Sequence, residues 1–246
     1  MNLMRAIIVR VLVSFSLVSC SGASVDRMTT HARLVELVPI EVDRKRVERR
    51  NFGALTLLSA FQLASKDKRF GGLSGLSVGP DGRLYAVSDH GFWLSTSMLL
   101  DPDGALKDLV DWRIAPILTT TKLPVRGSLR DAEALAQARD GSFLVAFEGF
   151  HRIWRYSPPP KTFESIPVSV QIPSAVAQAA PSNGGIEALT TLADGRLLII
   201  AEELENPDGS VKAWVIDDGV ITHVFYPVFP PDKSAEDVAA WIQGSK

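Results

Sequence analysis

Cysteine is almost absent from this chain of 246 residues, since Cys20 is the only one. A single cysteine excludes an intramolecular disulfide and every zinc site built from several cysteines. Lysines and arginines (26) do not outnumber aspartates and glutamates (28), so no excess of positive charge is available for a nucleic-acid partner. Beyond residue 20 no apolar run reaches about 18 residues, which excludes a protein with several membrane-spanning helices. The remaining composition, 46% hydrophobic and 22% charged, is that of a globular protein with a sizeable core.

The N-terminal segment is predicted to be an export signal rather than part of the fold. Basic residues precede and interrupt an apolar stretch, residues 6–18, and small residues follow it. Leu-Val-Ser-Cys at residues 17–20 resembles the bacterial lipobox, in which the cysteine is lipidated and becomes the mature N-terminus. We therefore expect a signal peptide over residues 1–19, then a lipidated Cys20 and a polar tether over residues 20–33. Such a chain is anchored in the cell envelope, at the outer membrane or the periplasmic face; plain secretion is the alternative.

A repeated pattern organises residues 34–246. Each repeat consists of an apolar strand, an Asp-Gly pair and a second apolar strand that ends in an acid, at residues 72–89, 131–148 and 185–202. Asp-Gly between such strands predicts a β-hairpin with a two-residue turn, because both central positions of that turn need positive φ. The Asp-Gly glycines lie 59 and then 54 residues apart, and weaker strand pairs lie between the hairpins. Four strands per repeat predict one blade of a β-propeller. A β-sandwich is the alternative, but it would not repeat one hairpin at a fixed period.

The end of the sequence predicts an incomplete propeller. Residues 236–244 have the spacing of residues 187–195, as if the first strand of a fourth repeat began there, and the chain ends at Lys246. The expected fold is therefore all-β, a propeller of four-stranded blades with about three and a half blades present. A C-terminally shortened gene product would explain this pattern.

Acidic residues recur at the open ends of the predicted hairpins. With two-residue turns, the directly opposite pairs are Ser74 with Asp89, Glu133 with Glu148, and Glu187 with Glu202. In a propeller these ends converge on one face, where like charges would destabilise the sheets unless a cation, raised pKa values or arginines offset them. Oxygen ligands without cysteine, and with only 4 histidines in the chain, suit Ca²⁺ or Mg²⁺ rather than zinc. The alternative is that these acids are solvated or accept backbone hydrogen bonds.

Four motifs follow one another in a fixed order. They are Phe-Gly-Gly-Leu-Ser-Gly-Leu at residues 70–76, Ser-Asp at 88–89, Asp-Ala-Glu-Ala-Leu at 131–135 and Asn-Gly-Gly-Ile-Glu-Ala-Leu at 183–189. Together they resemble the bacterial phytase-like family, which is described by an esterase-like activity of phytase. The resemblance covers roughly residues 35–246 and implies a six-bladed type of propeller, export from the cytoplasm and action on phosphate esters with calcium. The family usually continues through further Asp-Gly repeats, and its second motif commonly reads Asp-Pro-Glu-Gly-Leu.

These features predict a calcium-dependent phosphoesterase, in which bound Ca²⁺ neutralises phosphate oxygens and activates water. The predicted metal ligands are the acids at the repeated positions: Asp89, Glu133, Glu148, Glu187 and Glu202. The predicted phosphate-binding residues are the arginines beside the motifs: Arg69, Arg130 and Arg152. Each arginine could instead be an ordinary surface or inter-blade residue.

Two other functions remain open at this point. A serine esterase is disfavoured because Leu76 stands where the Gly-x-Ser-x-Gly motif around Ser74 would need glycine. A metal-dependent esterase or lactonase would use the same acidic face. A lipid-anchored binding module without catalysis would use the acids for a structural calcium site, or for none, because a propeller does not by itself imply catalysis.

Overall fold

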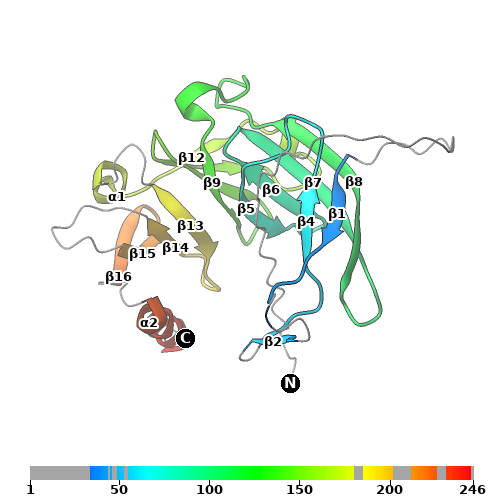
Figure 1. Cartoon of the computed structure of the whole chain (residues 1–246). Coiled ribbons are helices and arrows are strands. Elements are labelled where there is room, and N and C mark those ends of the chain that lie inside the picture. The colour runs from blue at the N-terminus through cyan, green and yellow to red at the C-terminus, as the bar shows by residue number, and fades with distance from the viewer. Residues whose placement is uncertain are drawn as a thin grey trace, which may run out of the picture. The chain divides into compact units, whose positions relative to one another are not determined.

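The computed structural model describes residues 34–43, 45, 49–52, 55–179, 185–201, 212–225 and 231–244 (Figure 1). The chain forms two compact units, Met1–Gly71 with Thr96–Trp112, and Gly72–Ser95 with Arg113–Lys246. The predicted signal peptide, the lipidated Cys20, the tether and Glu202 lie outside the described residues. None of the described helices is long and apolar enough to cross a membrane.

Short strands make up the N-terminal part of the first unit. Strand β1 (Glu36–Pro39) pairs antiparallel with β4 (Phe61–Ala64), and β2 (Asn51–Phe52) pairs with β3 (Leu55–Thr56). In the same unit the ring of Phe70 meets that of Trp112 edge to face, with centroids 5.8 Å apart.

Three four-stranded sheets carry the repeats, and in each the strands neighbour one another in chain order. The first contains β5 (Leu73–Val78), β6 (Leu84–Ser88), β7 (Phe92–Leu100) and β8 (Leu106–Pro116). The second contains β9 (Ala132–Gln137), β10 (Phe143–Phe147), β11 (Arg152–Tyr156) and β12 (Val168–Val170). The third contains β13 (Ile186–Thr191), β14 (Leu197–Ala201), β15 (Lys212–Asp217) and β16 (Val220–Phe225). Strand β9 contacts both β5 and β13, so the first strands of successive sheets lie side by side. The sheets are therefore blades of a β-propeller, as the sequence predicts.

Strand β10 of the middle blade is buried on both faces of the sheet. All five residues of β10 are buried, and alternate side chains point to opposite faces of the sheet. Leu144 and Ala146 pack in a cluster with residues of the third blade, whereas Phe143 packs with residues of the first. On that side Trp93, fully buried, has its ring centroid 5.9 Å from the ring of Phe143 and 5.2 Å from that of Tyr156. Two buried faces explain why β10 reads as a continuous apolar run.

The predicted two-residue turns are wrong for the three repeated hairpins. Backbone N–H groups of Gly79, Ala138 and Leu192 each donate to the carbonyl four residues on, which leaves three residues in each loop. Only the last of these residues, a glycine, has positive φ (76°, 81° and 99°). The preceding aspartate accepts the backbone N–H two residues later at 3.0 to 3.2 Å, an Asx turn that favours this longer loop. The two-residue turn is found instead at Asp218-Gly219, where both φ angles are positive.

A β-bulge follows at the same place in each inner hairpin. The register shifts across Ser74 in β5, Glu133 in β9 and Glu187 in β13, so none of the three has a residue directly opposite. The longer turn and the bulge together shift which residues lie opposite each other at the open end of the hairpin. The N–H of Asp89 donates to the carbonyl of Gly72, and the N–H of Glu148 donates to the carbonyl of Asp131, both at 2.9 Å. The predicted pairs Ser74–Asp89 and Glu133–Glu148 are therefore wrong, because that register assumed neither feature.

The segment expected to begin a fourth repeat is a helix, α2 (Pro231–Gly244), and that strand prediction is wrong. Alanines and long polar residues favour a helix over a strand. Val238 and Trp241, three residues apart, share one side of the helix. Both pack against a cluster of the third blade that contains Leu198, Val215 and Phe225. The remaining described helical segments are short: α1 (Ser174–Ala179) and single turns at Gly127–Leu129 and Thr162–Glu164.

Candidate metal centre

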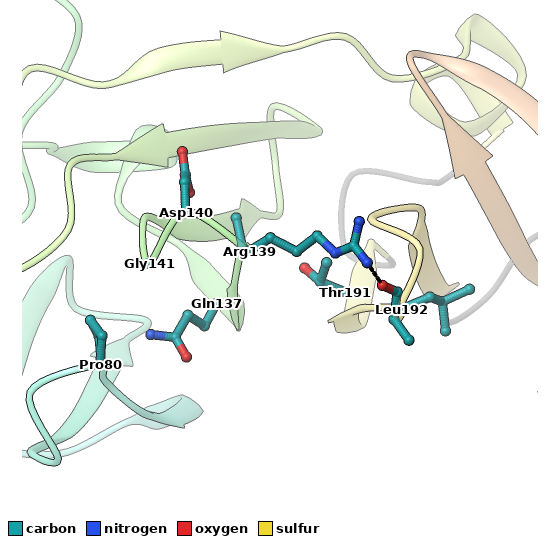
Figure 2. A pocket seen from close by; sticks show the side chains of 9 residues that line it. Pro80, Gln137, Arg139, Asp140, Gly141, Thr191 and Leu192 are labelled. Atoms are coloured by element: carbon teal, nitrogen blue, oxygen red, sulfur yellow. Dashed lines mark hydrogen bonds between the residues drawn. The ribbon is translucent and has the colours of Figure 1, made fainter.

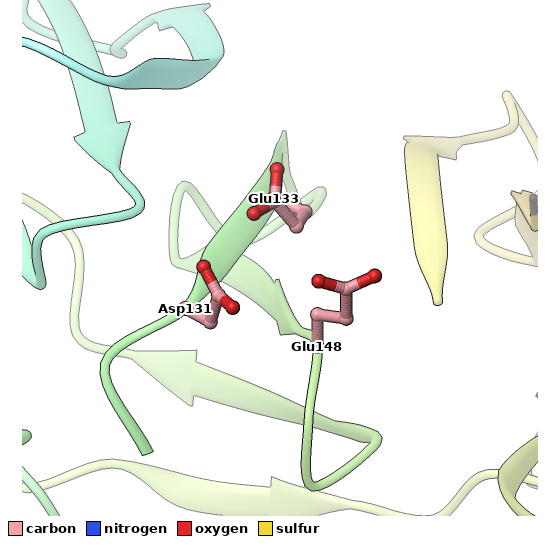
Figure 3. A group of neighbouring side chains, drawn as sticks. All are labelled: Asp131, Glu133 and Glu148. Atoms are coloured by element: carbon pink, nitrogen blue, oxygen red, sulfur yellow. The ribbon is translucent and has the colours of Figure 1, made fainter. Parts of the chain in front are cut away.

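Three carboxylates meet at the open end of the middle blade's inner hairpin (Figure 3). Asp131 directly precedes β9, Glu133 is the bulge residue within β9, and Glu148 directly follows β10. One oxygen of each lies within 4.8 Å of the others, and all three residues are partly buried. The hydrogen bond from the Glu148 N–H to the Asp131 carbonyl holds the two strand ends opposite each other.

Negative charge is concentrated around Glu133. Its pKa is raised from the ordinary 4.5 to about 8, first because burial disfavours the charged carboxylate. The negative charge of Glu187 adds to the effect, followed by that of Asp131 and Glu148. Glu187 occupies the bulge of the third blade, so carboxylates at equivalent positions of two blades act on one another. The sequence predicts this crowding of acids at the hairpin ends.

The third blade leaves room for the group by having glycine where the middle blade has Asp131. Gly185 is buried, and a Cβ atom there would lie 3.1 Å from both Glu148 Cγ and His151 Nδ1. Asp131 was not among the predicted ligands, although the spacing Asp131-Ala132-Glu133 is visible in the sequence. The bulge at Glu133 and the shifted pairing place Asp131 opposite Glu148.

Asp89 has different surroundings in the first blade. The equivalent neighbours there are Gly72 and Ser74, neither of which is acidic. The Asp89 carboxylate lies over Gly72, and its Oδ1 atom is 3.4 Å from Nε2 of His90. Asp89 does not belong to the carboxylate group of the middle blade. The fifth predicted ligand, Glu202, lies outside the described residues.

The three predicted phosphate-binding arginines are in different situations. Arg69, in the first unit, forms an ion pair with Asp67 at 2.6 Å. Arg130 is exposed and directly precedes Asp131. Arg152 donates hydrogen bonds to two backbone carbonyls and lies over two aromatic rings.

The carboxylate group suits a hard divalent cation. Ca²⁺ binds six to eight oxygen atoms, which carboxylates, backbone carbonyls and water supply together. Three carboxylates provide the charged part of such a shell, and the remaining positions would be left to water or substrate oxygens. The donor set of Asp131, Glu133 and Glu148 therefore fits Ca²⁺ or Mg²⁺, as expected from the composition.

A second feature lies at the opposite ends of the same strands, beside the Asp-Gly loops (Figure 2). An open pocket of about 440 Å³ is lined there by residues of three loops, among them Pro80, Gln137, Arg139 and Thr191. Arg139 reaches from the middle blade to the third, where it donates to the carbonyls of Ala193 and Asp194. This contact ties the two loops together.

Residues 68–242 match the family described as phytase-like, esterase-like activity of phytase. The chain belongs to this family. No curated protein matches the phytase-like chain. Among solved structures it is similar to a catalytically inactive virginiamycin B lyase from Staphylococcus aureus with quinupristin, at 16% identity and a TM-score of 0.40. That match covers 69% of this chain and 46% of the lyase.

Two further similar structures have comparable scores. The PQQ-bound aldose sugar dehydrogenase from Streptomyces coelicolor has 17% identity and a TM-score of 0.40, over 61% of this chain and 46% of the dehydrogenase. The Dos1 propeller has 13% identity and a TM-score of 0.37, over 63% of this chain and 36% of that protein. The phytase-like chain thus spans less than half the length of these three structures, and similarity at this level carries no argument about function.

Proposed function

We propose that this phytase-like protein is a calcium-dependent phosphoesterase. The observation that carries the proposal is the group of Asp131, Glu133 and Glu148, whose oxygens lie within 4.8 Å of one another on the propeller. Burial raises the pKa of Glu133 most, and the neighbouring carboxylates Glu187, Asp131 and Glu148 raise it further, which supports a place where a cation would be favoured. A divalent cation would relieve that repulsion, and the family description supports an ester as substrate.

Each residue has a distinct part in this proposal. Asp131 and Glu148, at facing strand ends, would hold the cation from two sides, and Glu133 would join them after losing its proton. Bound Ca²⁺ supplies neutralisation of phosphate oxygens and a water of lowered pKa. Arg130, exposed and adjacent in sequence to Asp131, is the arginine that we propose binds the phosphate group.

The test combines stability with turnover. Thermal unfolding is measured in chelator and in millimolar CaCl₂, because a ligand at one hundred times its Kd adds about 2.7 kcal/mol to stability. Hydrolysis of p-nitrophenyl phosphate and of phytate is then followed under both conditions. We expect stabilisation and hydrolysis with Ca²⁺ only, and loss of both in Asp131→Asn and Glu133→Gln. Glu164→Gln, an exposed acid outside the group, is the matched control.

The outcomes separate the alternative functions. Stabilisation by Ca²⁺ without hydrolysis of any ester would indicate a calcium-binding module and overturn the phosphoesterase. Hydrolysis of carboxylic esters or lactones, but not of phosphate esters, would indicate the other enzymatic function. An unfolding transition that ignores Ca²⁺ would overturn the metal centre itself.

We further propose that the protein is exported and anchored to the cell envelope through a lipid on Cys20. The support is the apolar leader and the Leu-Val-Ser-Cys sequence at residues 17–20. Labelled fatty acid should be incorporated into the wild-type chain and not into Cys20→Ser, and the variant should move from the membrane to the soluble fraction. Equal labelling of the two would overturn the anchor.

A further inference from the structure

We propose that Arg152 is a positioning residue that fastens together the two chain segments carrying Asp131 and Glu148. This inference rests on the proposed function only for the identity of the cation. It gives Arg152 a role different from phosphate binding, which is what the sequence suggests for it.

The hydrogen bonds of Arg152 reach both segments. Nη1 donates to the carbonyl of Phe150 at 2.8 Å, and Nη2 donates to the carbonyl of Leu129. Leu129 lies two residues before Asp131, and Phe150 lies two residues after Glu148. One planar guanidinium therefore bridges the approach to the first carboxylate and the exit from the second.

Two aromatic rings hold the guanidinium in place. Its central carbon lies 4.0 Å from the ring centroid of Phe147 and 4.3 Å from that of Trp154, and both rings are buried. The two rings themselves meet edge to face at 5.1 Å. Burial lowers the pKa of Arg152 to about 10, so the side chain is still charged at neutral pH and can be attracted by the ring faces.

The two segments lie close together at several points. The N–H of Glu148 donates to the carbonyl of Asp131 at 2.9 Å, which joins the two segments directly. Gly149 has φ of 72°, and a Cβ atom there would lie 3.0 Å from the Ser128 carbonyl oxygen. Arg152 adds a side-chain clamp to this backbone arrangement.

Its contacts favour positioning over phosphate binding. Both terminal nitrogens already donate to carbonyls, and the rings of Phe147 and Trp154 pack against the guanidinium. A phosphate group would have to compete with these contacts. Replacing a group that orients metal ligands without itself contacting the metal typically lowers metal affinity by about 10- to 100-fold.

The first experiment measures the clamp without any metal. Amide hydrogen exchange of the full chain in chelator is compared for wild type, Arg152→Met and Arg155→Ala. Arg155 is the matched control because it lies on the same strand, is exposed and pairs with Asp140 at 3.5 Å. We expect faster exchange at the Glu148 amide and in residues 128–131 for Arg152→Met alone. Exchange like that of wild type would overturn the inference, whether or not the protein binds Ca²⁺.

The second experiment measures Ca²⁺ binding by calorimetric titration with CaCl₂. We expect the affinity of Arg152→Met to fall by about 10-fold or more, and that of Arg155→Ala to stay unchanged. If Arg152→Met does not fold, Arg152→Lys decides, because it keeps a charge near the rings but cannot bridge two carbonyls with a fork of donors. A variant with unchanged Ca²⁺ affinity and a raised KM for the phosphate ester would overturn positioning in favour of phosphate binding. Wild-type protein that binds no Ca²⁺ would overturn the proposed function. The positioning role of Arg152 would then be decided by the hydrogen-exchange experiment alone.

Discussion

The backbone N–H of Glu148 donates to the carbonyl oxygen of Asp131 at 2.9 Å, so their side chains leave the ends of two paired strands side by side. Glu133 occupies the bulge next to them, and an oxygen of each carboxylate lies within 4.8 Å of the others. Charges of one sign in partly buried surroundings destabilise a fold unless a proton or a cation accompanies them. The stability of the protein should therefore respond to both.

The first prediction concerns pH in the absence of metal. The pKa of Glu133 is about 8 in the folded chain and about 4.5 when unfolded. Between these values the folded state binds one more proton than the unfolded state, so this group makes stability fall as pH rises from about 4.5 to 8. Carboxyls with lowered pKa, such as that of Asp140, have the opposite effect, but only at pH below about 5.

Urea unfolding in chelator at pH 5 to 9 measures this dependence. Glu133→Gln should flatten the decline and should be more stable than wild type at pH 8 and above. Glu164→Gln should keep the wild-type profile. A wild-type stability that stays constant between pH 5 and 8 would contradict the charge crowding.

The second prediction concerns the competition between proton and cation. Because Glu133 must lose its proton to join a metal site, the apparent affinity for Ca²⁺ should rise as pH increases from 6 to about 8. Calorimetric titrations in two buffers of different ionisation enthalpy should show proton release on binding. Neither effect is expected in Glu133→Gln. Binding by wild type with no proton released at pH 7 would exclude Glu133 as a ligand.

The third prediction compares two glycines that both have positive φ. Gly72 (φ 55°) and Gly82 (φ 76°) lie in the first blade, but a Cβ atom at Gly72 would lie 1.7 Å from Asp89 Oδ1, whereas one at Gly82 would meet nothing within 4 Å. Alanine in the left-handed region costs about 1–2 kcal/mol. Gly82→Ala should lower the free energy of unfolding by that amount. Gly72→Ala should lower it by more, because the Asp89 carboxylate must also move.

A double-mutant cycle isolates the steric part of this effect. In the Gly72→Ala/Asp89→Ala double variant the loss at Gly72 should shrink to about that of Gly82→Ala. Thermal unfolding provides the measurement. Equal losses for the two single variants would show that Asp89 does not lie over Gly72.

The sequence predicts the large features of the fold, the repeats and blades, better than it predicts the length of single loops. The repeated hairpins, the four-stranded blades and the acids at one end follow from apolar strands and Asp-Gly pairs that recur after 59 and then 54 residues. The loop length does not, since Asp-Gly fits both a two-residue turn and a three-residue loop. Asp218-Gly219 takes the first form and Asp81-Gly82 the second, where the Asp81 side chain accepts the Arg83 N–H at 3.2 Å.

Glu133 and Glu148 of the candidate metal centre could be predicted from the sequence, and Asp131 could not, for a related reason. Pairing in a hairpin depends on every residue of the loop and on any bulge, and an error of one residue changes which side chains are neighbours. Loop and bulge together exchange Glu133 for Asp131 as the residue opposite Glu148. The bulge itself has no sequence signal strong enough to predict, although it recurs at Ser74 and Glu187.

The last prediction concerns α2 and the third blade. Trp241 stacks on His223 at 4.8 Å, meets Phe225 edge to face at 5.6 Å and lies 4.9 Å from the guanidinium carbon of Arg196. Trp241→Ala should therefore lower the free energy of unfolding by about 1–3 kcal/mol, the range for losing a packed side chain. Ile242→Ala, at an exposed neighbouring position, should change it by less than about 0.5 kcal/mol. Urea unfolding followed by hydrogen exchange of residues 212–225 would locate the loss, because a helix packed on this blade protects those amides. Equal effects of the two variants would mean that α2 does not rest on the third blade through Trp241.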